Sequence, residues 1–314
     1  MTARRTLRVG ARGSTLAQVQ TRWVLGRLAS HHPDLKFDVV TLRTTGDIIL
    51  DRSLDRVGGK GLFTDTIERA IMAREIDFAV HSLKDLPTLP TPGLILGAVP
   101  EREDPRDALV GCSLRDLEHP DRAIKIGTCS LRRIAQLQRR FAGIEVVSMR
   151  GNVDTRLRKV REKQVDGAVL ALAGLRRLGH ESEVTHTFAP DQILPAPGQG
   201  ALAVQIREDD QALRELLESI HCHDTSRCVL AERAVLARLE GGCQVPVAAL
   251  AEIQSDQLHL RANVISLDGN TLVESSLSGP AKQPEALGLQ LAEVLIQQGA
   301  DRIISEILRE ARHA

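Results

Sequence analysis

The sequence predicts an α/β protein with two units of alternating strands and helices, followed by a small α+β unit. Three observations support this prediction. The chain of 314 residues is long for one hydrophobic core, so two or three domains are expected. Short apolar runs alternate with amphipathic stretches, which is typical of βαβ units with a parallel sheet. Near the C-terminus, residues that alternate in polarity replace this pattern.

The first unit is predicted to have the order βαβαβ. Ser14 is expected to be the N-cap of an amphipathic helix that continues to about His31. A second helix is expected over residues 64–74, after the glycine-bearing loop "VGGKGLF". Prolines in "LKDLPTLPTPG" end the regular structure. The strands are expected over residues 6–11, 37–42 and 76–82.

A second unit with the same order begins near Asp107. Its helices are expected over residues 130–141 and 152–163, and a proline-glycine turn leads into a further strand within 194–206. Its other strands are expected over residues 123–129, 144–149 and 166–172. The third unit contains the alternating stretch 257–279, in which Asp268-Gly269 is a hairpin signal. Helices over residues 284–298 and 300–312 follow it.

The composition excludes several classes of protein. A net charge of zero argues against a nucleic-acid partner, and 2% aromatic residues disfavour base stacking. No apolar stretch is long enough for a membrane helix, and the basic N-terminus lacks the apolar run of a secretory signal. Five cysteines without regular spacing do not form a disulfide framework. A cytoplasmic protein with reduced thiols is expected.

Arginines gather where predicted strands end and helices begin. Only seven of the 41 basic residues are lysine, and arginine binds carboxylate or phosphate with a planar fork of donors. The alternatives are a GC-rich genome and arginines that simply face solvent. Because ligands collect at the carboxyl ends of parallel strands, a polyanionic ligand between two domains is expected. The arginines concerned are Arg12, Arg132, Arg133, Arg150, Arg156, Arg176 and Arg177.

Asp85 follows a predicted strand and stands two residues before Pro87, on a restricted loop. Its carboxylate could serve in acid-base chemistry or stabilise a developing cation, and the alternative is an Asx-turn or cap. Lys84 beside it is a further candidate for anion contact. The nearby "VGGKG" is no Walker A motif, because Gly61 follows Lys60.

The cysteines divide into two groups. The stretch "HCHDTSRC" (221–228) contains donors suited to a metal, but its spacing matches no zinc pattern. Asp224 is instead expected to cap a helix on which Cys228, Ala231 and Val235 share a buried face. Cys243, in "LEGGCQVP", follows two glycines. That setting favours an accessible thiolate that bonds covalently to a ligand over a structural thiol or a disulfide.

Together, several of these motifs resemble the porphobilinogen deaminase (hydroxymethylbilane synthase) family. They are "HSLKDLP", "VGGKGLF", "EREDPRDAL", "GTCSLRR", "RGNVDTRL", "AGLRRLG", "PAPGQGAL" and "AERAVLARLEGGCQVP", in this order. The resemblance extends from about residue 7 to the last helix. It implies an enzyme that condenses four porphobilinogen molecules head to tail, releases ammonia and yields 1-hydroxymethylbilane for tetrapyrrole biosynthesis.

The resemblance also implies an architecture. Two α/β domains like those of periplasmic binding proteins are joined by two crossovers and followed by a small α+β domain. The expected bounds are 4–100 with 201–218, 106–194, and 223–314. The stretch "LPAPGQGALAVQI" thereby becomes the return to the first domain. The resemblance also implies a monomer, and no metal, nucleic-acid or membrane partner is expected.

Roles for individual residues follow from the matched motifs. Cys243 would carry a dipyrromethane cofactor through a thioether, and Asp85 would be the catalytic carboxylate. Further cofactor contacts are implied for Phe63, Ser82, Lys84, Thr128, Ser130, Arg132 and Arg133. Substrate contacts are implied for Arg12, Ser14, Gln20, Lys60, Arg150, Arg156 and Arg177. Cys129 departs from the serine usual in the family, which weakens one expected cofactor contact.

Two other classes of function stay open at this point. A non-catalytic anion-binding module would explain the arginines but gives Cys243 and Asp85 no role. A zinc protein would use residues 221–228.

Overall fold

The computed structural model describes residues 6–42, 64–239 and 245–313. The chain forms two compact units, each of which brings together distant parts of the sequence. The first comprises the chain through Glu103 together with residues 201–226, and the second comprises residues 104–200 and 227–314.

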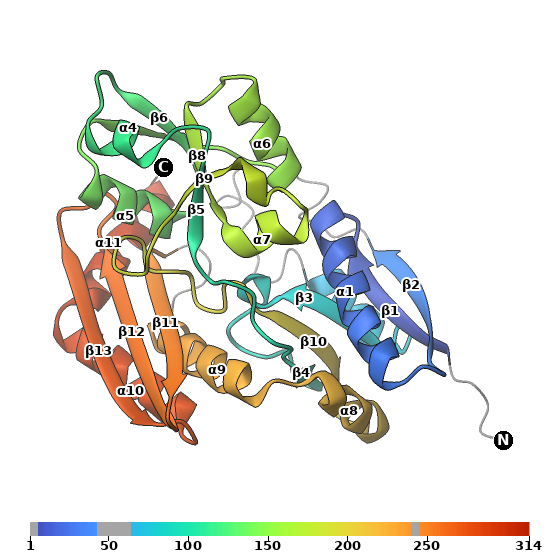
Figure 1. Ribbon diagram of the computed structural model, residues 1–314. Helices are drawn as coiled ribbons and strands as arrows, with labels where there is room; N and C mark the ends of the chain where they lie inside the picture. Colours follow the sequence, from blue (N-terminus) through green and yellow to red (C-terminus); the bar gives the residue numbers. More distant parts are fainter. Residues whose placement is uncertain (1–5, 43–63, 240–244, 314) are drawn as a thin grey trace. The chain divides into compact units, whose positions relative to one another are not determined.

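The first unit contains a five-stranded sheet with the order β2-β1-β3-β10-β4 (Figure 1). Its elements are β1 (Thr6–Arg12), α1 (Thr15–His31), β2 (Lys36–Leu42), α3 (Asp65–Met72), β3 (Phe78–Ser82), β4 (Leu94–Ala98), β10 (Leu202–Arg207) and α8 (Gln211–Leu217). Strands β2, β1 and β3 are parallel, as predicted, but β10 lies antiparallel between β3 and β4. The antiparallel β10 makes the sheet mixed. This strand comes from a part of the chain more than a hundred residues away from β3.

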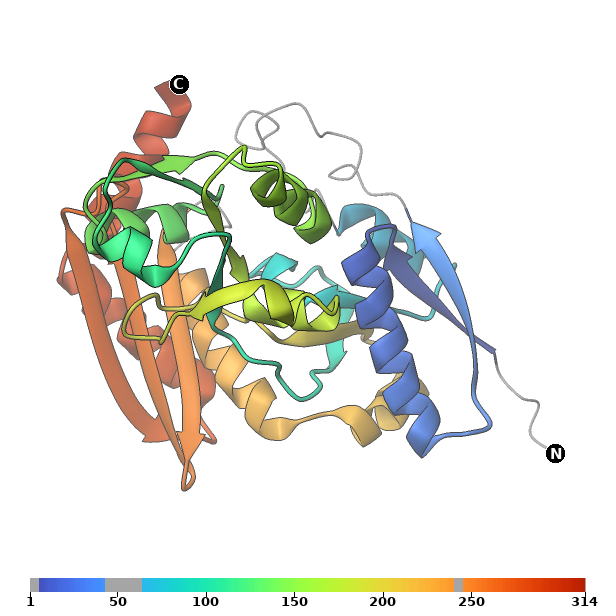
Figure 2. The ribbon, with the colours of Figure 1, turned by 45° about the horizontal axis from the view of Figure 1, so that its top comes forward.

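The two faces of this sheet have separate cores. Helix α1, visible against the strands in Figures 1 and 2, buries Val24 and Leu28 against Val9, Phe78 and neighbouring strand residues. The opposite face packs on α3 through a second cluster, Ile67, Ala70, Ile71, Ile76, Ala79 and Leu94. Ser14 caps α1 as predicted, since its Oγ accepts a hydrogen bond from the Ala17 N–H at 3.3 Å.

The second unit begins with another five-stranded sheet, of order β7-β6-β8-β5-β9. Its elements are β5 (Asp107–Val110), β6 (Ile124–Gly127), α5 (Leu131–Arg140), β7 (Ile144–Val147), α6 (Val153–Arg161), β8 (Gly167–Ala171), α7 (Leu172–Arg177) and β9 (Val184–Thr187). The predicted strands and helices are confirmed, and β5 is the antiparallel strand beside β8. Strands β5 and β9 were not predicted, because each has only four residues and shows no periodicity.

A three-stranded antiparallel sheet, β11-β12-β13, completes the second unit. Its elements are α9 (His223–Arg238), β11 (Val247–Gln254), β12 (Gln257–Ile265), β13 (Leu272–Pro280), α10 (Pro284–Gln297) and α11 (Ala300–His313). The hairpin at Asp268-Gly269 joins β12 to β13 as predicted, and helices of this unit pack on the sheet (Figures 1 and 2). Together with the two mixed sheets, this part confirms the predicted α/β fold with a small C-terminal α+β element.

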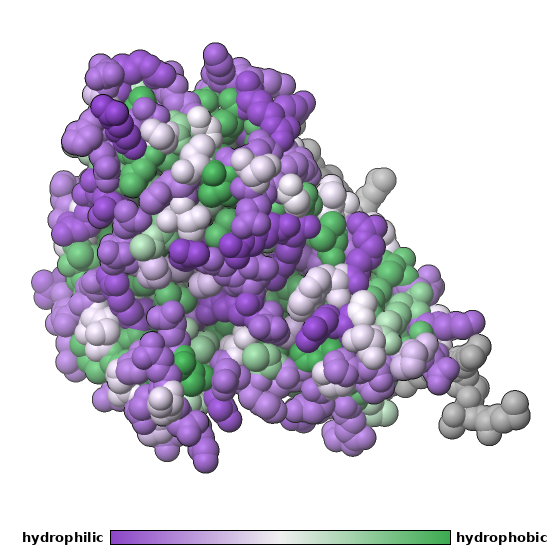
Figure 3. Space-filling view, in the orientation of Figure 1, coloured by the Kyte–Doolittle hydropathy of each residue, from purple (hydrophilic) through white to green (hydrophobic). Residues whose placement is uncertain are grey.

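Two details of α9 bear on the cysteine predictions. Cys228 lies in the core with Ala231 and Val235, as expected for a small buried residue. The prediction that Asp224 is the N-cap was wrong, because α9 begins at His223 and Asp224 already lies in its first turn. In the parts of the chain that the structure describes, no helix is long and apolar enough to cross a membrane. Polar side chains cover much of the face seen in Figure 3, and hydrophobic residues interrupt them in small groups.

Candidate active site

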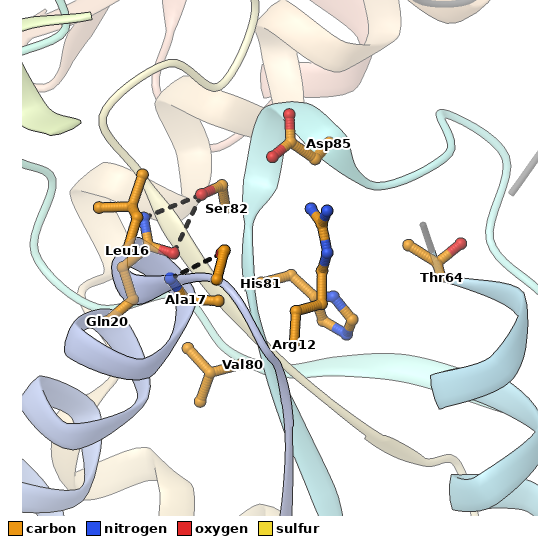
Figure 4. Close-up of a pocket in the computed structure, with 10 residues that line it drawn as sticks. Arg12, Leu16, Ala17, Gln20, Thr64, Val80, His81, Ser82 and Asp85 are labelled. Carbon is orange, nitrogen blue, oxygen red and sulfur yellow. Dashed lines mark hydrogen bonds between the residues drawn. The ribbon is translucent and has the colours of Figure 1, made fainter. Parts of the chain in front are cut away.

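A pocket in the first unit lies where β1 and β3 end and α1 begins. It is lined by Arg12, Ser14, Leu16, Ala17, Gln20, Thr64, Val80, His81, Ser82 and Asp85 (Figure 4). The parallel pairing of β1 with β3 brings the carboxyl ends of both strands to one edge of the sheet. Five residues predicted from the sequence, Arg12, Ser14, Gln20, Ser82 and Asp85, thus share one pocket.

Gln20 and Ser82 form a fixed polar pair on one wall. Gln20 is 4% exposed, and its carboxamide lies 2.9 Å (Nε2) and 3.1 Å (Oε1) from the Ser82 hydroxyl. Figure 4 shows these contacts between the helix and the end of β3. Because Gln20 is buried, it holds the Ser82 hydroxyl in place at the edge of the pocket.

Asp85 is an exposed carboxylate on a firmly anchored backbone. It ends a short 3-10 helix (Leu83–Asp85) between the buried side chains of Leu83 and Leu86. The Leu83 N–H donates to the Ala201 carbonyl at 3.0 Å, which ties this turn to the chain entering β10. Figure 4 shows the Arg12 side chain directed toward the part of the pocket where Asp85 lies. A carboxylate held this way can approach a ligand without moving its backbone.

His81 is an ionisable residue of the pocket that the sequence analysis missed. The ring is buried, which lowers the pKa of His81 to about 4; the charge of Arg12 adds to this effect, and the acceptor of Gln205 opposes it. His81 is therefore neutral at pH 7. A histidine inside the apolar strand sequence "FAVHS" was the available signal.

In the second unit, Arg132 and Arg133 form a buried ion cluster with Asp107. Arg132 Nη1 lies 2.7 Å from Asp107 Oδ2, and Arg133 Nη2 and Nε lie 2.7 and 3.2 Å from Oδ1. All three residues are at most 5% exposed. Burial by itself would raise the pKa of Asp107, but the two guanidinium charges outweigh it and hold the pKa well below its usual range.

Each arginine of this pair also donates to a backbone carbonyl, whereas Arg132 Nε makes no hydrogen bond within the described residues. Arg132 Nη1 donates to the Leu194 carbonyl at 2.8 Å and Arg133 Nη1 to the Val169 carbonyl at 2.9 Å. Gln199 Nε2 adds a bond of 2.8 Å to Asp107 Oδ1. The sequence did not reveal Asp107 as the partner of the two arginines. The sequence analysis named it only as the residue near which the second unit begins. Arg132 and Arg133, which were expected to contact a ligand, therefore also stabilise the interior of this unit.

The other predicted residues of this unit lie after β6, β7 and β8, three parallel strands. Arg156 donates to the Gly151 carbonyl at 2.8 Å, and its Nη2 lies 3.6 Å from the exposed Cys129 Sγ. Arg177 Nη2 donates to the Gly200 carbonyl at 2.7 Å. Arg150 and Ser130 are half-buried, and Thr128 is buried with its Oγ1 accepting from the Ser130 N–H at 3.2 Å. This edge of the sheet is rich in cationic groups, as predicted.

Three predicted site residues, Lys60, Phe63 and Cys243, lie outside the described residues. The zinc alternative gains no support, because the described residues contain no group of three side chains suited to a metal. His221 Nδ1 instead accepts from the Val99 N–H at 3.2 Å, and His223 lies 3.2 Å from Glu218.

Comparison with known proteins identifies the family. Residues 7–215 match the family model "Porphobilinogen deaminase, dipyromethane cofactor binding domain". Residues 226–297 match "Porphobilinogen deaminase, C-terminal domain". Among solved structures, the effector binding domain of a BenM variant is 16% identical with a TM-score of 0.39 and covers 72% of this chain and 94% of its own, a likeness too weak to bear on function.

Curated relatives match along nearly their whole length. The porphobilinogen deaminase of Carboxydothermus hydrogenoformans is 46% identical over 304 residues, which cover 96% of this chain and 97% of that relative. The porphobilinogen deaminase of Synechococcus elongatus is 48% identical over 312 residues, 98% of this chain and 97% of that relative. Both family models and both relatives agree with the motifs of the sequence, and this chain belongs to the porphobilinogen deaminase family.

Proposed function

We propose that this protein is a porphobilinogen deaminase, which joins four porphobilinogen molecules head to tail and releases 1-hydroxymethylbilane for tetrapyrrole biosynthesis. The observation that supports this most directly is the pocket of the first unit. There an exposed carboxylate, Asp85, shares one cavity with Arg12 and with the fixed Gln20–Ser82 pair. An anion-binding module would need the cation but not the carboxylate.

Asp85 is the residue proposed to carry the chemistry. When the aminomethyl ammonium of porphobilinogen leaves as ammonia, the remaining methylene-pyrrole is a cation. A carboxylate fixed beside it stabilises that charge. After a pyrrole α-carbon attacks the methylene, the same carboxylate can take the proton that the carbon loses. One residue thus serves both the formation of the cation and the restoration of the aromatic ring.

The arginines are proposed to hold the acetate and propionate groups that every pyrrole carries. Arg12 would act from the first unit; Arg150, Arg156 and Arg177 from the carboxyl ends of β7 and β8 and the helices that follow. Arg132 and Arg133 share one carboxylate between two cations, so their cluster retains a net positive charge. The proposed supporting contacts are those of Ser14, Gln20, Lys60, Phe63, Ser82, Lys84, Thr128 and Ser130.

The cofactor is proposed to be a dipyrromethane bound covalently through Cys243. When bound, it supplies the terminal pyrrole to which substrate units are added. The donor set fits such a group, because arginines and hydroxyls suit a polycarboxylate.

Intact mass spectrometry of the purified protein tests this function. The wild-type chain should be heavier than its sequence by one dipyrromethane, and Cys243→Ser should lose that increment. Cys222→Ser and Cys129→Ser are matched controls that should keep it. A folded wild-type protein from a haem-producing host that carries no increment would exclude the enzyme and favour the anion-binding module.

Turnover of porphobilinogen tests the role of Asp85. Asp85→Asn removes the charge but keeps the shape, so most turnover should be lost while the fold is unchanged by circular dichroism. Asp65→Asn, which alters an exposed carboxylate paired with Arg69 on α3, is the control and should keep wild-type turnover. Near-normal turnover in Asp85→Asn would refute the proposed role.

We also propose a cytoplasmic protein with no nucleic-acid or membrane partner, and a monomer, as the family resemblance implies. Light scattering after size exclusion should give the mass of one chain, 34.3 kDa plus the cofactor.

A further inference from the structure

Beneath the pocket of the first unit, three buried polar side chains lie among aliphatic residues on one face of the sheet. Glu68 on α3, His81 on β3 and Gln205 on β10 are 7%, 5% and 5% exposed. The neighbours on this face are the aliphatic residues that pack between α3 and the strands. Buried polar groups of this kind are costly unless they are paired, so their arrangement calls for a physical reason.

Glu68 fixes the orientation of Gln205. Its Oε1 accepts from Gln205 Nε2 at 3.0 Å, and its Oε2 accepts from Thr91 Oγ1 at 2.9 Å. Gln205 Nε2 is the donor in this bond, so the carboxamide turns its NH₂ group toward Glu68. The carboxamide oxygen of Gln205 is thereby presented on the other side, away from Glu68.

That oxygen is available to His81. In the antiparallel register, Ala203 is paired with His81 and Gln205 with Ala79, so His81 and Gln205 are diagonal neighbours on one face. Gln205 Oε1 and His81 Nε2 are both buried, and neither makes a well-formed hydrogen bond within the described residues. One is an acceptor and the other can carry a proton, so a small adjustment pairs them and fixes the tautomer of the ring.

His81 also lines the pocket together with Arg12, whose side chain lies in front of the ring in Figure 4. A neutral ring can pack against the Arg12 guanidinium. It adds no negative charge that would pair with Arg12 in place of a ligand carboxylate. A cation at the same place would instead repel Arg12. The series of side chains from Glu68 through Gln205 to His81 therefore leads to Arg12. Arg12 is proposed to bind the carboxylate of the substrate.

We propose that His81, oriented by Glu68 and Gln205, is a positioning residue that aligns Arg12 for the carboxylate of porphobilinogen. This inference rests on the proposed function. Asp85 carries the chemistry. Disrupting the series of side chains from Glu68 to His81 should therefore weaken substrate binding more than it slows turnover of bound substrate.

Steady-state kinetics of the cofactor-loaded enzyme test this proposal. Gln205→Leu and His81→Leu should raise KM for porphobilinogen about tenfold or more while kcat falls less than threefold. His81→Gln keeps a donor and an acceptor and should recover most of the lost affinity. Val204→Ala is the control: Val204 lies on the same strand as Gln205, but in the core on the α1 side. It should destabilise the unit and leave KM unchanged.

A second readout does not depend on activity. In ¹⁵N-histidine NMR spectra of the wild type, His81 should show one neutral tautomer between pH 6 and 8, and Gln205→Leu should give a mixture. An unchanged KM in both leucine variants, or a KM in Val204→Ala that rises as much as theirs, would overturn the proposal. If the wild type itself fails to turn over porphobilinogen, the proposed function fails instead, and the NMR spectra still test whether Gln205 orients the ring.

Discussion

The ion cluster around Asp107 makes a prediction about stability that can be worked out from its geometry. Asp107 is fully buried and accepts four hydrogen bonds, from Arg132 Nη1 (2.7 Å), Arg133 Nη2 (2.7 Å), Arg133 Nε (3.2 Å) and Gln199 Nε2 (2.8 Å). Asp107→Asn keeps the shape of the side chain but leaves two buried guanidinium groups without an anion.

The expected loss is large. Removing one partner of a buried ion pair costs about 3–5 kcal/mol, because the remaining charge is left buried and uncompensated. That is a substantial fraction of the roughly 5–15 kcal/mol by which proteins are stable. The free energy of unfolding is measured by urea titration at pH 7, followed by circular dichroism. Trp23, the only tryptophan and a residue of α1, reports the first unit separately by fluorescence.

The control is Glu145→Gln. Glu145 and Lys125 form an ion pair of 4.0 Å in the same unit, and both side chains are more than half exposed, 55% and 53%. Such a pair contributes about 0–1 kcal/mol. If Asp107→Asn costs no more than this control, the buried charges are compensated in some other way and the argument is refuted.

Three further predictions concern stability. Gly288→Ala on α10 should cost about 1–3 kcal/mol in urea unfolding, because a Cβ there would overlap the Ala231 carbonyl oxygen of α9; an unchanged midpoint would show that the helices separate freely. Asn152→Ala should cost about 1 kcal/mol, because the Asn152 side chain caps α6 by accepting from the Thr155 N–H at 2.9 Å; Asn152→Asp, which keeps the cap, should cost much less. The pKa of His81 is about 4 in the folded protein and 6.5 in the unfolded chain, so the unfolded chain binds more protons between these values and stability falls as pH drops from 6.5 to 4. His81→Gln should flatten this dependence in Trp23 fluorescence, and an equally steep dependence in the variant would assign it to other groups.

The position of the candidate catalytic groups could be predicted from local sequence. Hydrophobic periodicity indicated β1, α1 and β3, and residues directly after such strands fall at one sheet edge because parallel strands point the same way. Arg12 and Asp85 were found in this way, and both line the pocket. The assignment of a covalent cofactor to Cys243 depended on family resemblance, and that residue lies outside the described part of the chain.

Partners of buried polar groups could not be predicted locally. Asp107 meets Arg132 and Arg133 only because β5 is inserted antiparallel beside β8. Gln205 meets Glu68 only because β10 returns to the first sheet from more than a hundred residues away.

Periodicity within a window of a dozen residues therefore determined which segments are strands and helices, and at which ends the charged residues stand. Only the tertiary structure decided which of those charged residues form ion pairs with one another. Pairing across strands depends on chain reversals that no local pattern encodes, and the free energy of a buried charge depends on the partner that it finds.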